Sequence, residues 1–445
     1  MRYSRRYFLK TALWAAMGVV CAGLGSCVSI QRLPQRQRKP NIILVVADEL
    51  GCHDLGCYGH PAMHTPNLNR MAKQGLRFTR FYGASAQDAP ARCCLMTGVH
   101  TGHARITSND RGPLLPSDST LGKIIKRAGY MTGCIGRWEV GDHALKNDPW
   151  NNGFDYFFGQ LSRDHGSKPY PQVLWRNGNG SKNSLVRAEE INRNDYTPDL
   201  FTHDAVTFIE NHVDQPFFLY LPFSVSHSSC DLGTAANLPG YHRYQNKPWT
   251  EQRKMHAAML THLDRSMGRI LKTLGKLHLD QDTVVMFTSV RPGSQEPLRA
   301  QQRGHEGDLR VPFVVRWPGK IKSGRVAHTP CVSWDILPTV ARLSGSTQTP
   351  GTDGVSLLPT LLELPEQKTQ SRYLYWQHDH QGELYRAVRL GPWKGVRIGQ
   401  DRHLALYHLI NDPAEETDVS DRFPEVVADI EQLFAEAQQP LGETQ

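Results

Sequence analysis

The segment Asn41–Ala47 (NIILVVA) constrains the fold most, because it is a continuous apolar run rich in β-branched residues. A run of this kind predicts a strand buried on both faces, as in parallel sheets that are covered by helices. Four similar segments follow it and predict further strands at 131–135, 217–225, Thr283–Ser289 and Phe313–Arg316.

Helical patterns lie between these strands. At residues 65–67 a threonine and a proline stand in the order favoured at a helix N-terminus, and residues 250–277 carry apolar side chains on one helical face. Further helices are expected at 120–128, 202–212 and 334–344. The alternation predicts an α/β domain with a mostly parallel central sheet flanked by helices.

A polar segment at 362–370 separates this domain from a smaller one. Short strands are expected after it at 373–376, 385–390 and Trp393–Ile398, followed by a helix at 424–438. We therefore expect a large α/β domain at 40–363 and a small C-terminal α+β domain with a short antiparallel sheet at 364–445.

The first 40 residues differ from the rest of the chain in charge. They hold eight of the 51 basic residues and no acidic residue, and the remaining 43 basic residues equal the 43 acidic residues in number. A neutral body argues against a nucleic-acid partner.

The same leader predicts export. Arg5 and Arg6 precede an apolar run that is short for a membrane span and ends just before Cys27, a pattern typical of a twin-arginine lipoprotein signal. We expect a signal at 1–27 and a linker at 28–39. The protein would then cross the bacterial inner membrane and be periplasmic or at the cell surface, anchored in the membrane through a lipid on Cys27.

Polar residues follow the predicted strands at their carboxyl ends, where open α/β sheets collect functional groups. These residues are Asp48 and Glu49, Arg137 and Glu139, His227 and, after the apolar Val290, Arg291. A helix-opening segment that contains Asp88 and Arg92 lies between the first two strands. Together they form the candidate site.

Several motifs in this order resemble the sulfatase family of the alkaline-phosphatase superfamily. They are the segments 39–42 (KPNI), 65–68 (TPNL), 75–79 (GLRFT), 153–155 (GFD), 216–219 (PFFL), 310–313 (RVPF) and 412–415 (DPAE). The resemblance extends over nearly the whole chain after the leader. It implies an alkaline-phosphatase-like fold and, as the family activity, hydrolysis of sulfuric esters of glycans or aryl groups.

The nucleophile position departs from the family pattern. Sulfatases carry a cysteine or serine two residues before the proline that Pro90 matches, and its oxidation gives a formylglycine whose hydrate attacks the sulfur. Asp88 occupies this position. A carboxylate cannot be oxidised to that aldehyde, so the resemblance implies that the formylglycine route is closed.

The metal-ligand positions depart as well. The family holds a calcium-like divalent cation with four side chains, and the matching residues here are Asp48, Glu49, Val290 and Arg291. A valine offers no ligand atom and an arginine repels a cation. We therefore expect a broken metal site and no bound cofactor.

The groups that hold the sulfate are only partly kept. The family's Gly-Lys-Trp-His matches residues 136–139, so that Arg137 keeps a cation while Glu139 replaces the proton-transferring histidine. A later lysine matches Gln301. Only Arg92 and His227 match unchanged. Both could merely hydrogen-bond within the protein, whereas Arg92 together with Arg137 could still bind an anion.

Asp88 itself allows three interpretations. It could stabilise a helix start by facing free backbone N–H groups, act as a covalent nucleophile, or contact a ligand. Cys93 and Cys94, which follow it, are expected to pack in the core rather than to replace the nucleophile.

The carboxylates Asp48, Glu49 and Asp88 would repel one another if nothing compensated their charge. We expect the guanidinium of Arg291 to take the place of the cation and to form an ion pair with Asp48 or Glu49. The alternative is a reshaped metal site in which the three carboxylates act with His227 or His305.

Three functions are compatible with this pattern. The chain could be a pseudoenzyme that binds a sulfated or other anionic glycan in the inherited cleft. It could be an active hydrolase of sulfate or phosphate esters that uses Asp88. It could also be a structural partner of another surface protein, such as an active relative.

Overall fold

The computed structural model describes residues 38–109, 112–140, 148–161, 170–171, 173–177, 185–187, 195–224, 238–293, 304–346, 351–365, 372–380, 382–399 and 403–439. The predicted signal, Cys27, most of the linker, His227 and Gln301 lie outside these residues. Within the described part of the chain, none of the helices combines the length and the apolar composition that a bilayer span needs.

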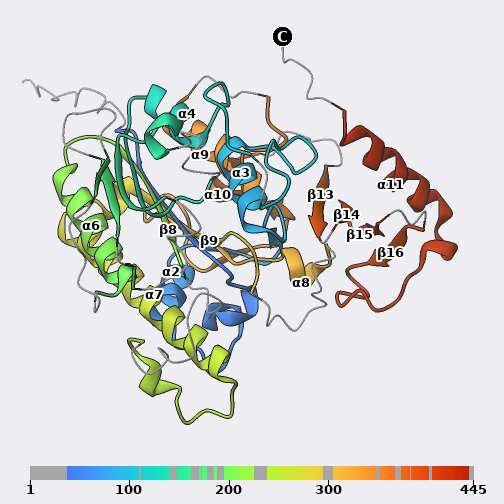
Figure 1. Cartoon of the computed structure of the whole chain (residues 1–445), viewed down its shortest axis with the longest axis horizontal. Coiled ribbons are helices and arrows are strands. Elements are labelled where there is room, and N and C mark those ends of the chain that lie inside the picture. The colour runs from blue at the N-terminus through green and yellow to red at the C-terminus, as the bar shows by residue number, and fades with distance from the viewer. Residues whose placement is uncertain are drawn as a thin grey trace, which may run out of the picture. The chain divides into compact units, whose positions relative to one another are not determined.

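A ten-stranded sheet runs through the middle of the fold (Figure 1), in the order β11-β2-β10-β9-β1-β8-β4-β5-β6-β7. Its strands are β1 (Asn41–Ala47), β2 (Leu76–Phe78), β4 (Met131–Arg137), β5 (Tyr156–Gln160), β6 (Trp175–Asn177), β7 (Leu185–Arg187), β8 (Phe217–Phe223), β9 (Thr283–Ser289), β10 (Phe313–Arg316) and β11 (Arg325–Ala327). The central strand β1 is buried throughout and runs parallel to β8 and β9. The predicted α/β class and the mostly parallel sheet are confirmed.

Helices cover both faces of this sheet. They are α2 (Pro66–Lys73), α3 (Asp88–Thr97), α4 (Leu121–Arg127), α6 (Thr197–Asn211), α7 (Glu251–Lys276), α8 (Glu306–Leu309), α9 (Ile336–Ser344) and α10 (Leu358–Leu362). Alternate residues of β1 face opposite layers: Ile42 and Leu44 pack in the layer of α3, α4 and α9, whereas Ile43 and Val45 pack in the layer of α2, α6 and α7. The two apolar layers therefore fix β1, and with it the loop that follows β1.

The start of α2 differs from the prediction. Thr65 precedes Pro66, but its side chain does not cap the helix. Asp264 of α7 caps it instead, because its carboxylate accepts hydrogen bonds from the backbone N–H groups of Asn67 at 3.1 Å and Leu68 at 2.8 Å. A buried acid of one helix thus satisfies the free donors of another.

The C-terminal region forms the predicted antiparallel sheet. Its strands are β13 (Tyr373–His380), β14 (Glu383–Leu390), β15 (Trp393–Ile398) and β16 (Ala405–His408), and α11 (Pro424–Glu436) packs on them. A two-stranded sheet of β3 (Phe81–Tyr82) and β12 (Cys331–Val332) completes the fold. The residues from Lys39 onward form one compact unit.

A buried ion cluster ties the small sheet to the large domain. The fully buried Nζ of Lys394 in β15 lies 3.1 Å from Glu306 Oε1 in α8 and 3.2 Å from Glu415 Oε1. Burial acts to raise the pKa of Glu415, but Lys394 and then His305 outweigh it and lower that pKa to about 2. Glu415 therefore stays charged, and both carboxylates share the same cation.

We expect Lys394→Met to lower the free energy of unfolding by about 3–5 kcal/mol, because it leaves Glu306 and Glu415 buried without their shared cation. Urea unfolding of the purified protein measures this change. Lys322→Met is the matched control, since Lys322 is 76% exposed and pairs with Glu363 at the surface, where an ion pair contributes little. Equal losses in both variants would show that the Lys394 cluster contributes no more than a surface ion pair.

Candidate functional site

Seven of the predicted residues meet at the carboxyl ends of β1, β4 and β9 and at the start of α3. They are Asp48, Glu49, Asp88, Arg92, Arg137, Glu139 and Arg291, and we refer to them as the charge cluster. Parallel strands bring their carboxyl ends to one edge of the sheet, which explains why residues so distant in sequence lie together.

The inner part of the charge cluster is a closed ring of four side chains. Arg92, whose side chain is fully buried, forms an ion pair with one carboxylate oxygen of Asp48. Arg137 donates from Nη1 to the other oxygen of Asp48 at 2.8 Å and from Nε to Glu139 Oε1 at 3.1 Å. Glu139 Oε2 lies 3.8 Å from Arg92 Nη2 and closes the ring.

Burial governs the electrostatics of this ring. It raises the pKa of Asp48 to about 6, and the attraction of Arg92 and Arg137 offsets only part of this effect. The Asp48 carboxyl is thus still ionised at neutral pH. Burial acts against the charge of Arg137 as well, but Glu139 and Asp48 outweigh it and raise the pKa of Arg137.

The outer part of the charge cluster is centred on Arg291. Its Nε donates to Asp88 Oδ1 at 2.8 Å, and its Nη2 donates to Glu49 Oε1. Burial acts to raise the pKa of Asp88, but Arg291 and then Arg92 outweigh it and lower that pKa. The predicted ion pair between Arg291 and Glu49 is therefore present, and the pair with Asp88 is one that the sequence analysis did not predict.

The interpretation that Asp88 stabilises a helix start by facing free backbone N–H groups needs a correction. Asp88 is the first residue of α3, after Gln87 at the N-cap position, and its carboxylate binds Arg291. The side chain of Asn109 accepts the hydrogen bond from the backbone N–H of Ala89 at 3.1 Å. The arginine attracts the carboxylate more strongly than the helix end does, because it carries a full charge.

The remaining candidates fall into three groups. Val290 is buried and its backbone N–H donates to Ala47 O at 2.8 Å, so that its side chain only packs. Cys93 and Cys94 are buried in the core as predicted, and burial raises the pKa of Cys93 to about 11. His305 Nδ1 lies 3.4 Å from Glu415 Oε1 and thus belongs to the Lys394 cluster.

Backbone strain marks two acids of the charge cluster. Glu49 has a φ of 47° and Glu139 a φ of 41°, which is the left-handed region that residues with a side chain rarely adopt. Each of these turns follows a buried strand and directs a carboxylate toward a guanidinium group. Strain of this kind is typical of functional sites, and no sequence pattern pointed to it here.

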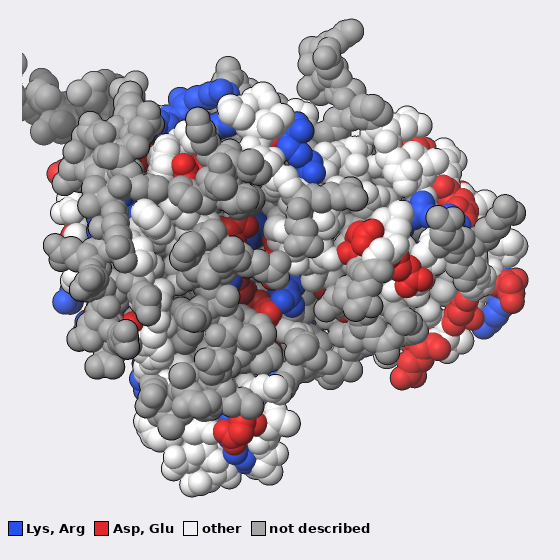
Figure 2. Space-filling view, in the orientation of Figure 1, with Lys and Arg blue, Asp and Glu red and all other residues white. Residues whose placement is uncertain are grey.

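The charge cluster neutralises itself. Its three arginines face four carboxylates, so the formal sum is one negative charge. Figure 2 shows acidic and basic atoms next to each other in the middle of the face, without an extended patch of either colour there. An oxyanion that approached Arg92 or Arg137 would have to compete with Asp48 and Glu139 for the same donors.

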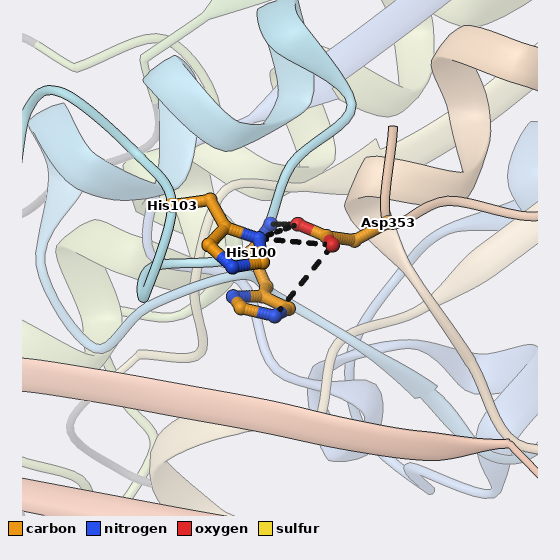
Figure 3. Close-up of side chains that lie close together, drawn as sticks. All are labelled: His100, His103 and Asp353. Atoms are coloured by element: carbon orange, nitrogen blue, oxygen red, sulfur yellow. Dashed lines mark hydrogen bonds and ion pairs between the residues drawn. The ribbon is translucent and has the colours of Figure 1, made fainter. Parts of the chain in front are cut away.

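A second cluster, of His100, His103 and Asp353, was not predicted (Figure 3). Its ligand atoms lie close enough for a metal ion, but their hydrogen bonds do not suit one. The backbone N–H of Gly102 donates to His100 Nδ1 at 3.1 Å, which places the proton of that ring on Nε2. His100 Nε2 therefore has no lone pair for a metal.

His103 contacts an acceptor with each ring nitrogen. Nδ1 lies 2.9 Å from Asp353 Oδ2, and Nε2 lies 2.7 Å from the carbonyl oxygen of Gln439. Burial acts to lower the pKa of His103, but the Asp353 carboxylate raises it overall. This ring is best described as a cation that joins the end of the α11 region to the large domain.

The chain matches known families over most of its length. Residues 40–346 match the sulfatase family model, and residues 301–440 match the model of the C-terminal region of N-sulphoglucosamine sulphohydrolase. N-acetylgalactosamine-6-sulfatase of Homo sapiens is 30% identical, over 80% of this chain and 71% of the relative. Arylsulfatase A of Homo sapiens is 31% identical, over 80% of this chain and 74% of the relative.

The fold agrees with these matches. The crystal structure of Ps i-CgsB in complex with k-i-k-neocarrahexaose superimposes with a TM-score of 0.77 at 26% identity, covering 91% of this chain and 95% of the other. The family that the sequence motifs resemble is thus confirmed by the family model, the relatives and the fold. This chain belongs to the sulfatase family.

Proposed function

We propose that this protein does not hydrolyse sulfuric esters by the formylglycine route and instead serves as a glycan-binding pseudoenzyme. The observation that carries the proposal is the position of Arg291. Its guanidinium lies between Asp88 and Glu49, where the family places a nucleophile and a metal ligand. Because Arg291 pairs with the residues at both positions, its guanidinium stands where the family's nucleophile and cation would act on the substrate.

Asp88 supports the proposal by its chemistry. A carboxylate cannot become the aldehyde hydrate that attacks sulfur, and the lowered pKa of Asp88 keeps it ionised and bound to Arg291. The side chain is one-quarter exposed. It is therefore partly accessible to solvent, but as an anion that repels a sulfate ester.

The side chains of the charge cluster do not fit a calcium ion. Calcium takes six to eight oxygen ligands in proteins. Both oxygens of Asp48 accept from arginines, and one oxygen each of Glu49 and Asp88 accepts from Arg291. The guanidinium stands among these oxygens and offers a positive charge where the cation of the family is bound.

Relatives suggest the class of ligand. N-acetylgalactosamine-6-O-sulfatase of Bacteroides thetaiotaomicron is 26% identical over 90% of this chain, and the Ps i-CgsB structure holds a carrageenan oligosaccharide. We infer an anionic glycan as the ligand of this chain. The leader supports a location outside the cytoplasm, with the body held to the membrane through Cys27.

One observation favours a second function. Asp88 is ionised, partly exposed and located at the nucleophile position of a hydrolase fold. Such a carboxylate could attack the phosphorus or sulfur of an ester and displace the alcohol, and water would then hydrolyse the resulting mixed anhydride. Turnover that depends on Asp88 would distinguish this function from the pseudoenzyme.

We expect no turnover of aryl sulfates or sulfated oligosaccharides above the buffer rate. Asp88→Cys, produced with a formylglycine-generating maturase, should remain inactive, because Arg291 and Val290 still leave the cation site incomplete. Release of sulfate or phosphate measures both outcomes. Recovery of activity in Asp88→Cys alone would refute the proposal, and wild-type turnover that Asp88→Asn abolishes would establish the second function.

Metal binding gives an independent test. Calcium should not raise the melting temperature of the wild type, whereas Val290→Asp with Arg291→Asn supplies two oxygen ligands and should gain about 2.7 kcal/mol at a calcium concentration of 100 times Kd. Arg291→Met is the control, because it removes the cation without adding a ligand. Stoichiometric calcium in the wild type by elemental analysis would contradict the proposal.

A further inference from the structure

A basic groove lies between α2 and α7, which run side by side (Figure 1). Six of its lining residues define the α2–α7 groove: Arg70, Gln74, Arg265, Arg269, Lys272 and Arg316. It is open to solvent and has a volume of about 580 Å³. Five of the six side chains are cationic.

The groove is built on a rigid base. Gly268 of α7 allows a close approach of α2, since a Cβ at this position would lie 2.7 Å from the side chain of Asn67. The amide of Asn67 donates to Asp264 Oδ2 at 2.8 Å. The two helices are thus held together directly beneath the cationic side chains.

The cations of α7 lie along one helical face. Arg265, Arg269 and Lys272 are spaced by four and three residues, so that their side chains form a row about 10 Å long. Arg70 of α2 lies across the groove from this row. The row has the length of a disaccharide unit rather than of a single small anion.

Most of this charge is not neutralised. Arg316 binds Asp280 with two hydrogen bonds, at 3.0 and 2.7 Å, and Arg269 lies 3.8 Å from Asp199. Within the described residues, no carboxylate lies at ion-pair distance from Arg70, Arg265 or Lys272. The contrast with the charge cluster is direct, because there every arginine is paired.

The groove is separate from the charge cluster. Arg316 ends β10, where it pairs with Val285 near the start of β9, whereas Arg291 follows the end of β9. The six residue-to-residue steps from Val285 to Arg291 span about 20 Å of extended chain. The two sites therefore lie at opposite ends of strand β9.

We propose that the α2–α7 groove is the binding site for an extended sulfated oligosaccharide; this inference rests on the proposed glycan-binding function and changes its location. Guanidinium groups bind sulfate oxygens with two parallel hydrogen bonds. A concave groove suits a sugar chain better than the flat surface of a bilayer. The ligand thus binds away from the inherited cleft, where carboxylates oppose it.

The test is calorimetric titration of the full body of the protein with a sulfated carrageenan hexasaccharide and with its desulfated form. Arg265→Gln with Lys272→Gln should raise the Kd for the sulfated form at least about tenfold, because two charge-assisted contacts are lost. The wild type should bind the desulfated form far more weakly. Increasing salt should weaken the sulfated complex.

The matched control is Arg127→Gln with Lys247→Gln, which removes the same two charges from exposed positions outside the groove. It should bind like the wild type, and thermal unfolding should show that both double variants are folded. Unchanged binding in the groove variant would refute the inference while the glycan-binding function stands.

Three further outcomes are decisive. No binding of the sulfated form by the wild type would refute the glycan-binding function and, with it, the ligand class assigned to the groove. Groove-dependent binding to vesicles of phosphatidylcholine with phosphatidylserine, without oligosaccharide binding, would overturn the inference in favour of a lipid surface. Loss of oligosaccharide binding in Asp88→Asn but not in the groove variant would place the ligand in the cleft.

Discussion

The candidate site depends on one interaction, the double ion pair in which Arg291 binds the carboxylates of Glu49 and Asp88. Four acids converge where the central strands end, and three of them are buried. Charges of one sign cannot remain at such short distances without compensation. In this chain three guanidinium groups compensate them, and the geometry of their ion pairs determines which side chains remain available to a ligand.

Much of the fold could be predicted from the sequence, because its strands are complete apolar runs. Asn41–Ala47, Thr283–Ser289 and Phe313–Arg316 were predicted with the observed ends. The direction of strand Phe313–Arg316 could not be predicted. It pairs antiparallel with β9, and the composition of a strand does not determine the direction in which it pairs. The cap of α2 was also missed, because Asp264 is almost two hundred residues away in sequence.

The sequence was enough to predict which residues form the candidate site, but not which acid each arginine binds. Carboxyl ends of parallel strands meet at one edge, which is enough to collect Asp48, Glu49, Arg137 and Arg291. Which acid each arginine binds depends on side-chain reach and on the left-handed turns at Glu49 and Glu139, and both are properties of the packed structure. The same limit applies to His100 and His103, whose hydrogen bonds come from a turn and from the far end of the chain.

The double pairing of Arg291 has an evolutionary consequence. A substitution at position 291 alone would leave Glu49 and Asp88 without their shared cation, and a substitution at position 88 alone would leave half of the guanidinium unpaired. Energies of residues that share partners do not add. Each single substitution at these positions would therefore pass through a less stable protein, so the shared ion pairs act as a ratchet against change at any one of the three positions.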